Sequence, residues 1–100
     1  MEKEKSLPNY YKTTPVFDLC SLPDKLRNAH QTKAGTWGII RVLEGNVRYV
    51  IEGTDEVLVL TPELPGLVLP EQLHHVEPMG DMRMQVEFYD HLPTPEELNP

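Results

Sequence analysis

The sequence predicts an all-β fold, either an antiparallel β-sandwich or a small barrel. About five to seven short runs of strand-forming residues follow one another, and turns that contain Gly or Pro separate them. One brief stretch carries the good helix signal of the chain. The length of 100 residues is typical of a single domain, so we expect one hydrophobic core.

We expect the chain to have three parts. Residues 1–9 are polar and of mixed charge, which indicates a flexible N-terminal arm. Residues 10–91 hold the strand-like runs and should form the β domain. Residues 92–100 contain three prolines without hydrophobic periodicity, which indicates a tail with, at most, a short helical turn at PEEL.

The first half of the domain should contain one extended segment, one helix and one hairpin. TTPVF at 13–17 is extended in character, and SLPDKLRNA follows it. Ser21 is placed to cap a short helix, with Asp24 three residues later, close to a capping box. TWGIIRVLEG and NVRYVIEG then flank a turn at Gly45, so we predict that 36–53 forms a β-hairpin.

The second half should be strands throughout. EVLVLTP follows a turn at 53–55, and PGLVLP and HHVEP are two further short extended pieces. The last strand, MRMQVEFYD, alternates clearly between two faces. One face carries Met82, Met84, Val86 and Phe88, and the other carries Arg83, Gln85, Glu87 and Tyr89.

The composition excludes several classes of partner. The net charge of −7 disfavours a nucleic-acid partner, because phosphate contacts need a positive surface. No apolar run approaches the roughly 20 residues that span a bilayer, and the first residues lack the apolar segment of a signal peptide. Cys20 is the single cysteine, which we expect to be a small buried hydrophobe. We therefore expect a cytoplasmic protein without a membrane or nucleic-acid partner.

The histidines are the candidate metal ligands. His30 precedes the first long strand, whereas His74 and His75 open a late one, and His91 lies at the edge of the tail. A divalent ion needs three or four convergent ligands, so the fold would have to bring His30 and His74 together. There is an alternative: paired histidines beside a proline turn are more commonly solvated surface groups than metal ligands.

The period of two along a strand restricts how this site could be completed. His74 shares a face with Val76, while His75 shares the opposite face with Glu77. Glu77 could join His74 only through a β-bulge that re-aims one of the two side chains. Glu87, on the last strand, could instead complete a His/His/Glu set, although a surface charge is the commoner role for such a residue.

Several motifs resemble the cupin-like domain of the tellurite-resistance protein B family, over about residues 10–90. The block H-x-T-K-x-G-T-W-G from His30 to Gly38 is the most specific of them. The others are K-T-x-P-V at 12–16, V-L-x-G at 42–45, P-x-x-x-H-x-V-E from Pro70 to Glu77, and the F-Y pair at 88 and 89.

This resemblance implies a cupin-like sandwich of jelly-roll type and a possible metal site. The general cupin pattern places histidines and a glutamate around a divalent metal, and His30 and His74 match it here. Glu87, Glu77 or waters would complete a shell around zinc, nickel or iron, and a metal-free pocket is equally compatible. Longer members of the family carry an S-adenosylmethionine-dependent methyltransferase module. This sequence lacks the glycine-rich strand–turn–helix stretch of such a module, so no S-adenosylmethionine is expected.

Two functional hypotheses follow from the resemblance. In the first, a small cupin-like domain binds a divalent metal, a small ligand or an oxyanion in its barrel pocket, as part of a response to tellurite or oxyanion stress. In the second, the chain is a non-enzymatic interaction module that forms a dimer and has an empty or vestigial pocket. A homodimer suits both hypotheses, and the sequence leaves open whether the chain is an enzyme.

Overall fold

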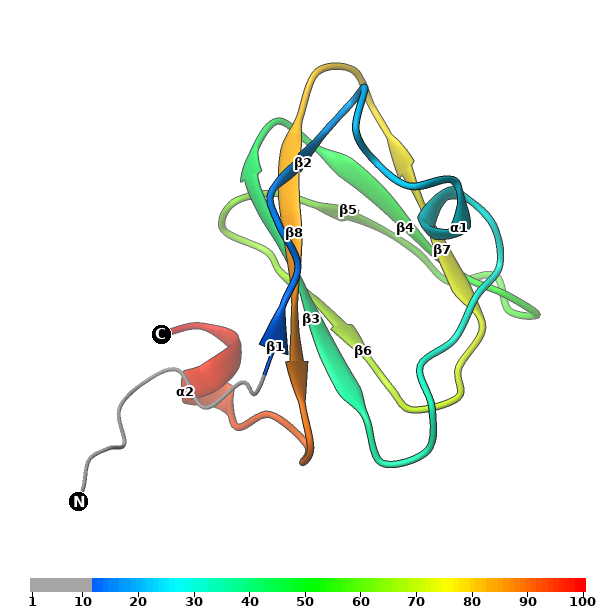
Figure 1. Cartoon of the computed structure of the whole chain (residues 1–100), viewed down its shortest axis with the longest axis vertical. Helices are drawn as coiled ribbons and strands as arrows, with labels where there is room; N and C mark the ends of the chain where they lie inside the picture. Colours follow the sequence, from blue (N-terminus) through cyan, green and yellow to red (C-terminus); the bar gives the residue numbers. More distant parts are fainter. Residues whose placement is uncertain (1–11) are drawn as a thin grey trace.

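Two antiparallel sheets face each other in the computed structural model, which describes residues 12–100 (Figure 1). The first, sheet A, has the order β1-β8-β3-β6, with β2 also paired to β8. Its strands are β1 (Lys12–Thr13), β2 (Phe17–Asp18), β3 (Trp37–Glu44), β6 (Gly66–Val68) and β8 (Arg83–Tyr89). The second, sheet B, has the order β5-β4-β7, formed by β5 (Val57–Leu60), β4 (Val47–Ile51) and β7 (His74–Pro78). The predicted all-β sandwich is therefore confirmed.

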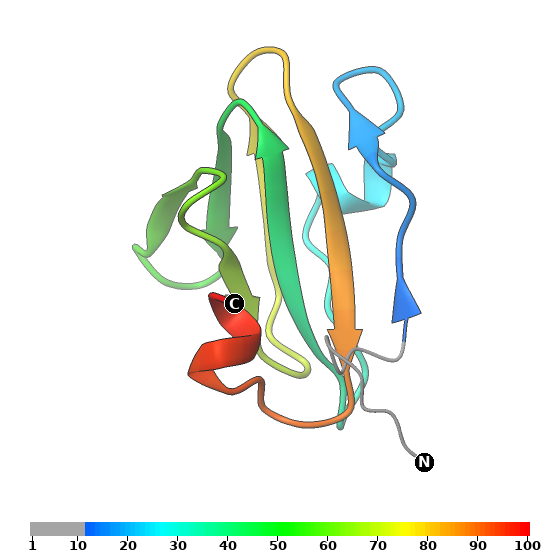
Figure 2. The ribbon, with the colours of Figure 1, turned by 90° about the vertical axis from the view of Figure 1, so that its left-hand side faces the viewer.

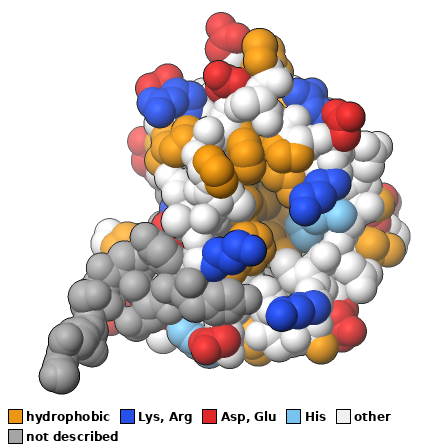
Figure 3. Space-filling model, in the orientation of Figure 1, with side chains coloured by type: hydrophobic (Ala, Val, Ile, Leu, Met, Phe, Trp, Pro, Cys, Tyr) orange, Lys and Arg blue, Asp and Glu red, His pale blue; other side chains and the backbone are white. Residues whose placement is uncertain are grey.

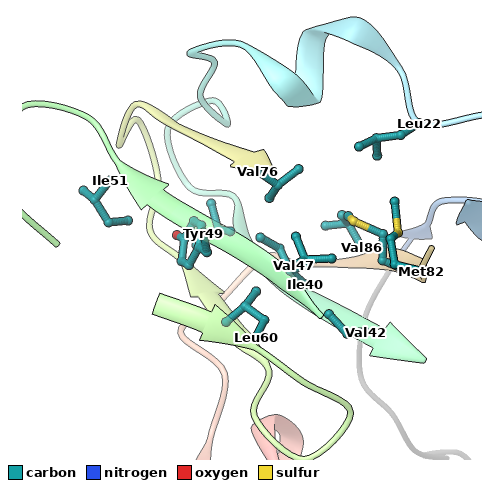
Figure 4. Close-up of a cluster of buried hydrophobic side chains, with 12 residues drawn as sticks. Leu22, Ile40, Val42, Val47, Tyr49, Ile51, Leu60, Val76, Met82 and Val86 are labelled. Atoms are coloured by element: carbon teal, nitrogen blue, oxygen red, sulfur yellow. The ribbon is translucent and has the colours of Figure 1, made fainter. Parts of the chain in front are cut away.

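The core lies between the two sheets and follows the period-two pattern of their strands (Figure 4). Met82, Met84 and Val86 point inward, as the alternation in the last strand predicted. Opposite them, β4 contributes Val47 and Tyr49, which are almost completely buried. Alternate residues of each strand thus fill the space between the layers, and the residues between them face outward.

The predicted hairpin over 36–53 is wrong. β3 pairs with β6 and β8 in sheet A, whereas β4 pairs with β5 and β7 in sheet B. The chain passes from one sheet to the other at Gly45, whose φ of 78° is a conformation that glycine adopts without strain. Both strands bury one apolar face, and that pattern fits strands that face each other across a core as well as strands that pair.

A short turn precedes the first helix and differs from the predicted cap. Helix α1 (Asp24–Arg27) begins after Pro23 and has no side-chain cap. Ser21 instead accepts a hydrogen bond from the backbone N–H of Asp18, and the Asp18 carboxylate accepts from the N–H groups of Cys20 and Ser21. This turn lies outside the core, so Cys20 is exposed rather than buried as expected.

Helix α2 (Pro95–Leu98) lies on the outer face of sheet A (Figure 2). Thr94 and Glu97 form a capping box at its start, which accounts for the helical turn at PEEL. Arg41 of β3 donates hydrogen bonds to the carbonyl oxygens of Glu97 and Leu98. Within residues 12–100, neither helix has the length and apolar character that a membrane crossing requires.

Replacing Gly45 should destabilise the fold more than replacing Gly53. Both glycines have φ of 78°, so an alanine in either place costs about 1–2 kcal/mol of backbone strain. At Gly45 the new Cβ would also lie 2.4 Å from the carbonyl oxygen of Asp81, while at Gly53 nothing lies within 4 Å. Urea denaturation of Gly45→Ala and Gly53→Ala should therefore show the larger loss for Gly45→Ala. Equal losses would contradict the close approach at the sheet crossing.

Candidate ligand-binding cavity

A cavity of about 650 Å³ opens between the two sheets at the end covered by α1. Its wall combines strands of both sheets with α1 and with the segment 30–36 that precedes β3. Figure 3 shows a hollow among hydrophobic side chains on this face, with Lys or Arg and His side chains beside it. This volume is within the roughly 300–1,000 Å³ that small-molecule sites occupy.

The inner wall of the cavity is apolar. Val76 comes from sheet B and the other residues from sheet A, and each is at most 7% exposed. They are Ile40, Val68, Val76, Met84 and Val86. Their inward orientation follows from strand alternation, so the same pattern that forms the core also forms the cavity wall.

The mouth of the cavity is cationic. Lys12 of β1, Lys25 of α1 and Lys33 of the following loop all line it and are exposed. They are all the lysines of residues 12–100, and no carboxylate in that range pairs with any of them. Among the described residues, those that line the cavity include no Asp or Glu, although the chain carries sixteen acidic residues.

His30 and His74 meet at the cavity wall. Their backbones form an isolated antiparallel bridge, with N···O distances of 3.0 Å from His30 to His74 and 2.9 Å in return. The ring centroids are 4.2 Å apart, and both rings line the cavity. His74 is 3% exposed and shares the inward face of β7 with Val76, which confirms the predicted orientation of this strand.

The backbone fixes the protonation pattern of both rings. Nδ1 of His30 lies 3.0 Å from the carbonyl oxygen of Asn28, and Nδ1 of His74 lies 2.8 Å from that of Gln72. A carbonyl oxygen only accepts, so each Nδ1 carries a hydrogen, and Nε2 of the neutral ring keeps its lone pair. Burial, partly offset by the bond to Gln72, lowers the pKa of His74 below its usual value.

His75 points the other way and belongs to a separate, outward-facing cluster. Its Nδ1 contacts the carboxylate of Glu52, and its Nε2 lies 2.8 Å from Glu77. Glu77, which is 48% exposed, also pairs with Arg48 at 3.5 Å. The hydrogen bond to Glu77, followed by that to Glu52, raises the pKa of His75. Glu77 therefore serves His75 and lies away from the cavity.

Glu87 lies on the outer face of sheet A. Its carboxylate accepts a hydrogen bond from Arg41 Nε at 3.2 Å and another from the hydroxyl of Tyr89 at 3.0 Å. Val86 and Phe88, the neighbours of Glu87 along β8, line the cavity on the opposite face. The strand period thus separates Glu87 from the two histidines.

Of the four residues predicted as metal ligands, the structure brings together His30 and His74 and holds Glu77 and Glu87 elsewhere. Across residues 12–100, no group of three or more His, Cys, Asp or Glu side chains is placed to hold a metal ion. Sequence reasoning missed the three lysines of the mouth. The sequence shows that residues 12–100 contain just these three lysines. Their convergence, however, depends on how β1, α1 and the loop fold over the cavity.

The pKa values of the two neighbouring histidines of β7 should be shifted in opposite directions. We expect His74 to have a pKa below the usual value of about 6.5 and His75 a pKa above it. NMR titration of the ring resonances measures both. Glu77→Gln should lower the pKa of His75 and leave that of His74 nearly unchanged. A higher pKa for His74 than for His75 would show that the inward and outward assignments are reversed.

The sequence and fold have counterparts among known proteins. Two curated relatives are described as "Probable S-adenosyl-L-methionine-dependent methyltransferase TehB", from Haemophilus influenzae strain 10810 and strain Rd. They are 38% and 36% identical to this chain over 86 residues. Each alignment covers 79% of this chain and 30% of the relative, so the chain spans about a third of the length of these proteins.

Solved structures agree with this similarity. The crystal structure of TehB from Haemophilus influenzae has a TM-score of 0.73 and 30% identity over 79% of this chain and 30% of that one. A protein of E. coli strain K12 has a TM-score of 0.72 and 22% identity over 85% and 95% of the two chains, which shows a shared fold. A family model described as "TehB-like domain" matches residues 12–86. The chain therefore belongs to the TehB-like family.

Proposed function

We propose that this TehB-like domain binds a small anionic molecule in the cavity between its sheets. The observation that carries the proposal is that basic side chains line this cavity, although the chain as a whole is acidic. Three lysines and two histidines line one cavity, and no acidic residue of the described chain joins them there. The lysines lack carboxylate partners within residues 12–100, so a bound anion would gain ion pairs without displacing existing ones.

Coulomb attraction at such a mouth is effective because the opposite wall is apolar. Two unit charges about 4 Å apart attract by about 1 kcal/mol in water and by several times more where protein replaces solvent. An apolar wall with buried Val68 and Met84 lowers the local dielectric on one side of the ligand. Cationic mouths of this kind also concentrate anions near the protein.

The donor set fits a divalent metal poorly. His30 and His74 do have the geometry of histidine ligands, because a carbonyl oxygen fixes each Nδ1–H and leaves Nε2 available. Zinc, nickel or iron would need one or two further protein ligands. Glu77 and Glu87 are engaged on outer faces, and the nearby cations are lysines, which repel a metal ion.

As its biological setting we propose the response to tellurite or a related oxyanion. The tellurite-resistance resemblance is compatible with an anion site, because tellurite is an oxyanion. Two antiparallel sheets that enclose a cavity with histidines from separate strands support the cupin relationship as well. The longer Haemophilus proteins, of which this chain matches 30%, are described as probable methyltransferases. We propose a cytoplasmic binding domain without assigning a reaction to it.

Anion binding should depend on the lysines of the mouth. Tellurite, sulfate, acetate and benzoate, each as a sodium or potassium salt, should be compared with chloride at matched ionic strength by thermal shift and calorimetry. We expect at least one anion to stabilise the protein, and Lys25→Gln/Lys33→Gln to weaken its binding by about fivefold.

Arg48→Gln/Arg83→Gln is the matched control, because it also removes two exposed cations, which pair with Glu77 and Glu44 away from the cavity. It should leave the affinity nearly unchanged. Binding of no anion, or equal losses in the lysine and arginine variants, would refute an anion site at the cavity mouth.

A second candidate function, homodimerisation, has its own observation. β5 is an edge strand of sheet B, and its consecutive residues Val57, Leu58 and Val59 are 49%, 49% and 42% exposed. Exposed apolar edge strands favour pairing with another strand. A second copy of this chain, adding its own β5, would bury them.

Light scattering over a concentration series tests this candidate. The wild type should form a dimer, and Leu58→Lys should shift it to a monomer because a charge would enter the strand interface. A wild-type protein that stays monomeric at about 100 µM, a concentration that would populate a dimer of micromolar affinity, would rule the candidate out.

A further inference from the structure

We propose that the natural ligand is an organic acid with a compact apolar body, and that it binds together with one proton taken up by the His30/His74 pair. This inference rests on the proposed anion site and goes beyond it in two respects. It names the chemical class of the ligand, and it assigns the pair of histidines a role distinct from that of the lysines.

The shape of the cavity selects against a bare inorganic oxyanion. Charge is confined to the mouth, while the wall formed by Ile40, Val76 and Met84 is apolar and buried. An ion of a few atoms would satisfy the lysines and leave this wall in contact with water. A carboxylate with a hydrocarbon body would cover the wall and gain binding free energy in proportion to the apolar surface removed from water.

Nε2 of His74 is a buried polar atom that lacks a partner. Among residues 12–100 no group forms a hydrogen bond with it, whereas Nδ1 is bonded to Gln72. Buried polar atoms are nearly always paired with protein or water, so this nitrogen is available to a polar group that enters the cavity. With a proton added, Nε2–H would donate to a carboxylate oxygen in the same cavity, which is a strong, charge-assisted arrangement.

The proton balance of this binding step is simple. The free protein has a neutral His74, because burial disfavours the imidazolium. A carboxylate that enters brings a negative charge beside the rings, and one proton from solution is bound at Nε2. A second proton on the pair is disfavoured, since two imidazolium rings with centroids 4.2 Å apart would repel each other.

Other charged groups face the pair from each element packed against it. Lys12, Lys25 and Lys33 line the same cavity from β1, α1 and the loop, and the neighbouring ring of His30 disfavours protonation of His74. On the far side of β7, His75 also opposes it, while Glu52 favours it. Because the lysines line the mouth of the same cavity, an anion held there would bring negative charge beside the rings, so proton uptake should be coupled to ligand binding.

Calorimetry with a homologous series of acids tests the ligand class. Acetate, butyrate, hexanoate and octanoate should bind with an affinity that rises about threefold per methylene until the cavity is full. Hexanol, which has an equally long body but no charge, should bind much more weakly than hexanoate. Tellurite or sulfate that binds as tightly as hexanoate would overturn the inference while supporting the proposed anion site.

Proton uptake is measured from the same titrations in bis-Tris and Tris chloride, two amine buffers with different ionisation enthalpies and no competing organic anion. At pH 7.5 we expect uptake of about one proton per hexanoate bound. His74→Gln should lose most of this uptake, and His75→Gln, altered at the adjacent outward-facing residue, should retain it. His30→Gln provides a second variant at a partly exposed position, in case His74→Gln folds poorly.

The outcomes separate the two proposals. Binding of hexanoate without proton uptake would overturn the role of the histidine pair, and the lysine-dependent anion site would stand. Equal uptake in wild type and both cavity-histidine variants would overturn it as well. A protein that binds neither the acids nor the inorganic anions would refute both proposals together.

Discussion

The backbone bridge between His30 and His74 determines how this domain is built around its cavity. Two hydrogen bonds of 3.0 and 2.9 Å hold the segment before β3 against the first residue of β7. A second tie, from the N–H of Glu71 to the carbonyl oxygen of Thr32 at 3.0 Å, extends the same contact. These bonds hold the loop that carries Lys33 beside the opening between the sheets. They thereby place His30 and Lys33 at the cavity.

Glutamates that form ion pairs lie on the outer faces of the sheets, whereas the three lysines lie at the cavity. On the outer faces, Glu52 and Glu77 hold His75, and Glu87 holds Arg41. On the inner side, the cations of the mouth remain without carboxylate partners in residues 12–100. The strand period accounts for the placement of Glu77 and Glu87, because successive residues of β7 and β8 alternate between the cavity and the outer faces, while the fold of β1, α1 and the loop brings the lysines together. An acidic chain thereby presents a cationic opening at one end of its sandwich.

Local periodicity accounts for what the sequence predicted well. It assigned the β class, the inward face of Met84 and Val86, and the opposite orientations of His74 and His75. Periodicity is silent on which strands pair, and for that reason the expected β3–β4 hairpin became two strands in different sheets. Periodicity does bear on the site. Glu87 has the right chemistry for a metal ligand, but the alternation along β8 places it opposite Val86 and Phe88 and therefore away from the cavity.

The remaining surprises depend on contacts between segments distant in sequence. Ser21 was expected to cap a helix, yet Asp18 recruits it into a turn of its own. The C-terminal residues gain a place on sheet A through the hydrogen bonds that Arg41 donates. The cationic mouth draws on β1, α1 and a loop, so no single stretch of sequence displays it. Such features cannot be predicted from one stretch of sequence, because the contacts that stabilise them form only when distant segments pack together.

The most direct test of the central claim is the ¹⁵N resonance of His74 Nε2 during addition of hexanoate at pH 7.5. The account predicts that this nitrogen moves from the shift of an unprotonated imidazole toward that of an imidazolium as the cavity fills, while the ring of His75 stays as it was. A His74 Nε2 resonance that does not move at saturating hexanoate, confirmed as bound by calorimetry, would contradict the account.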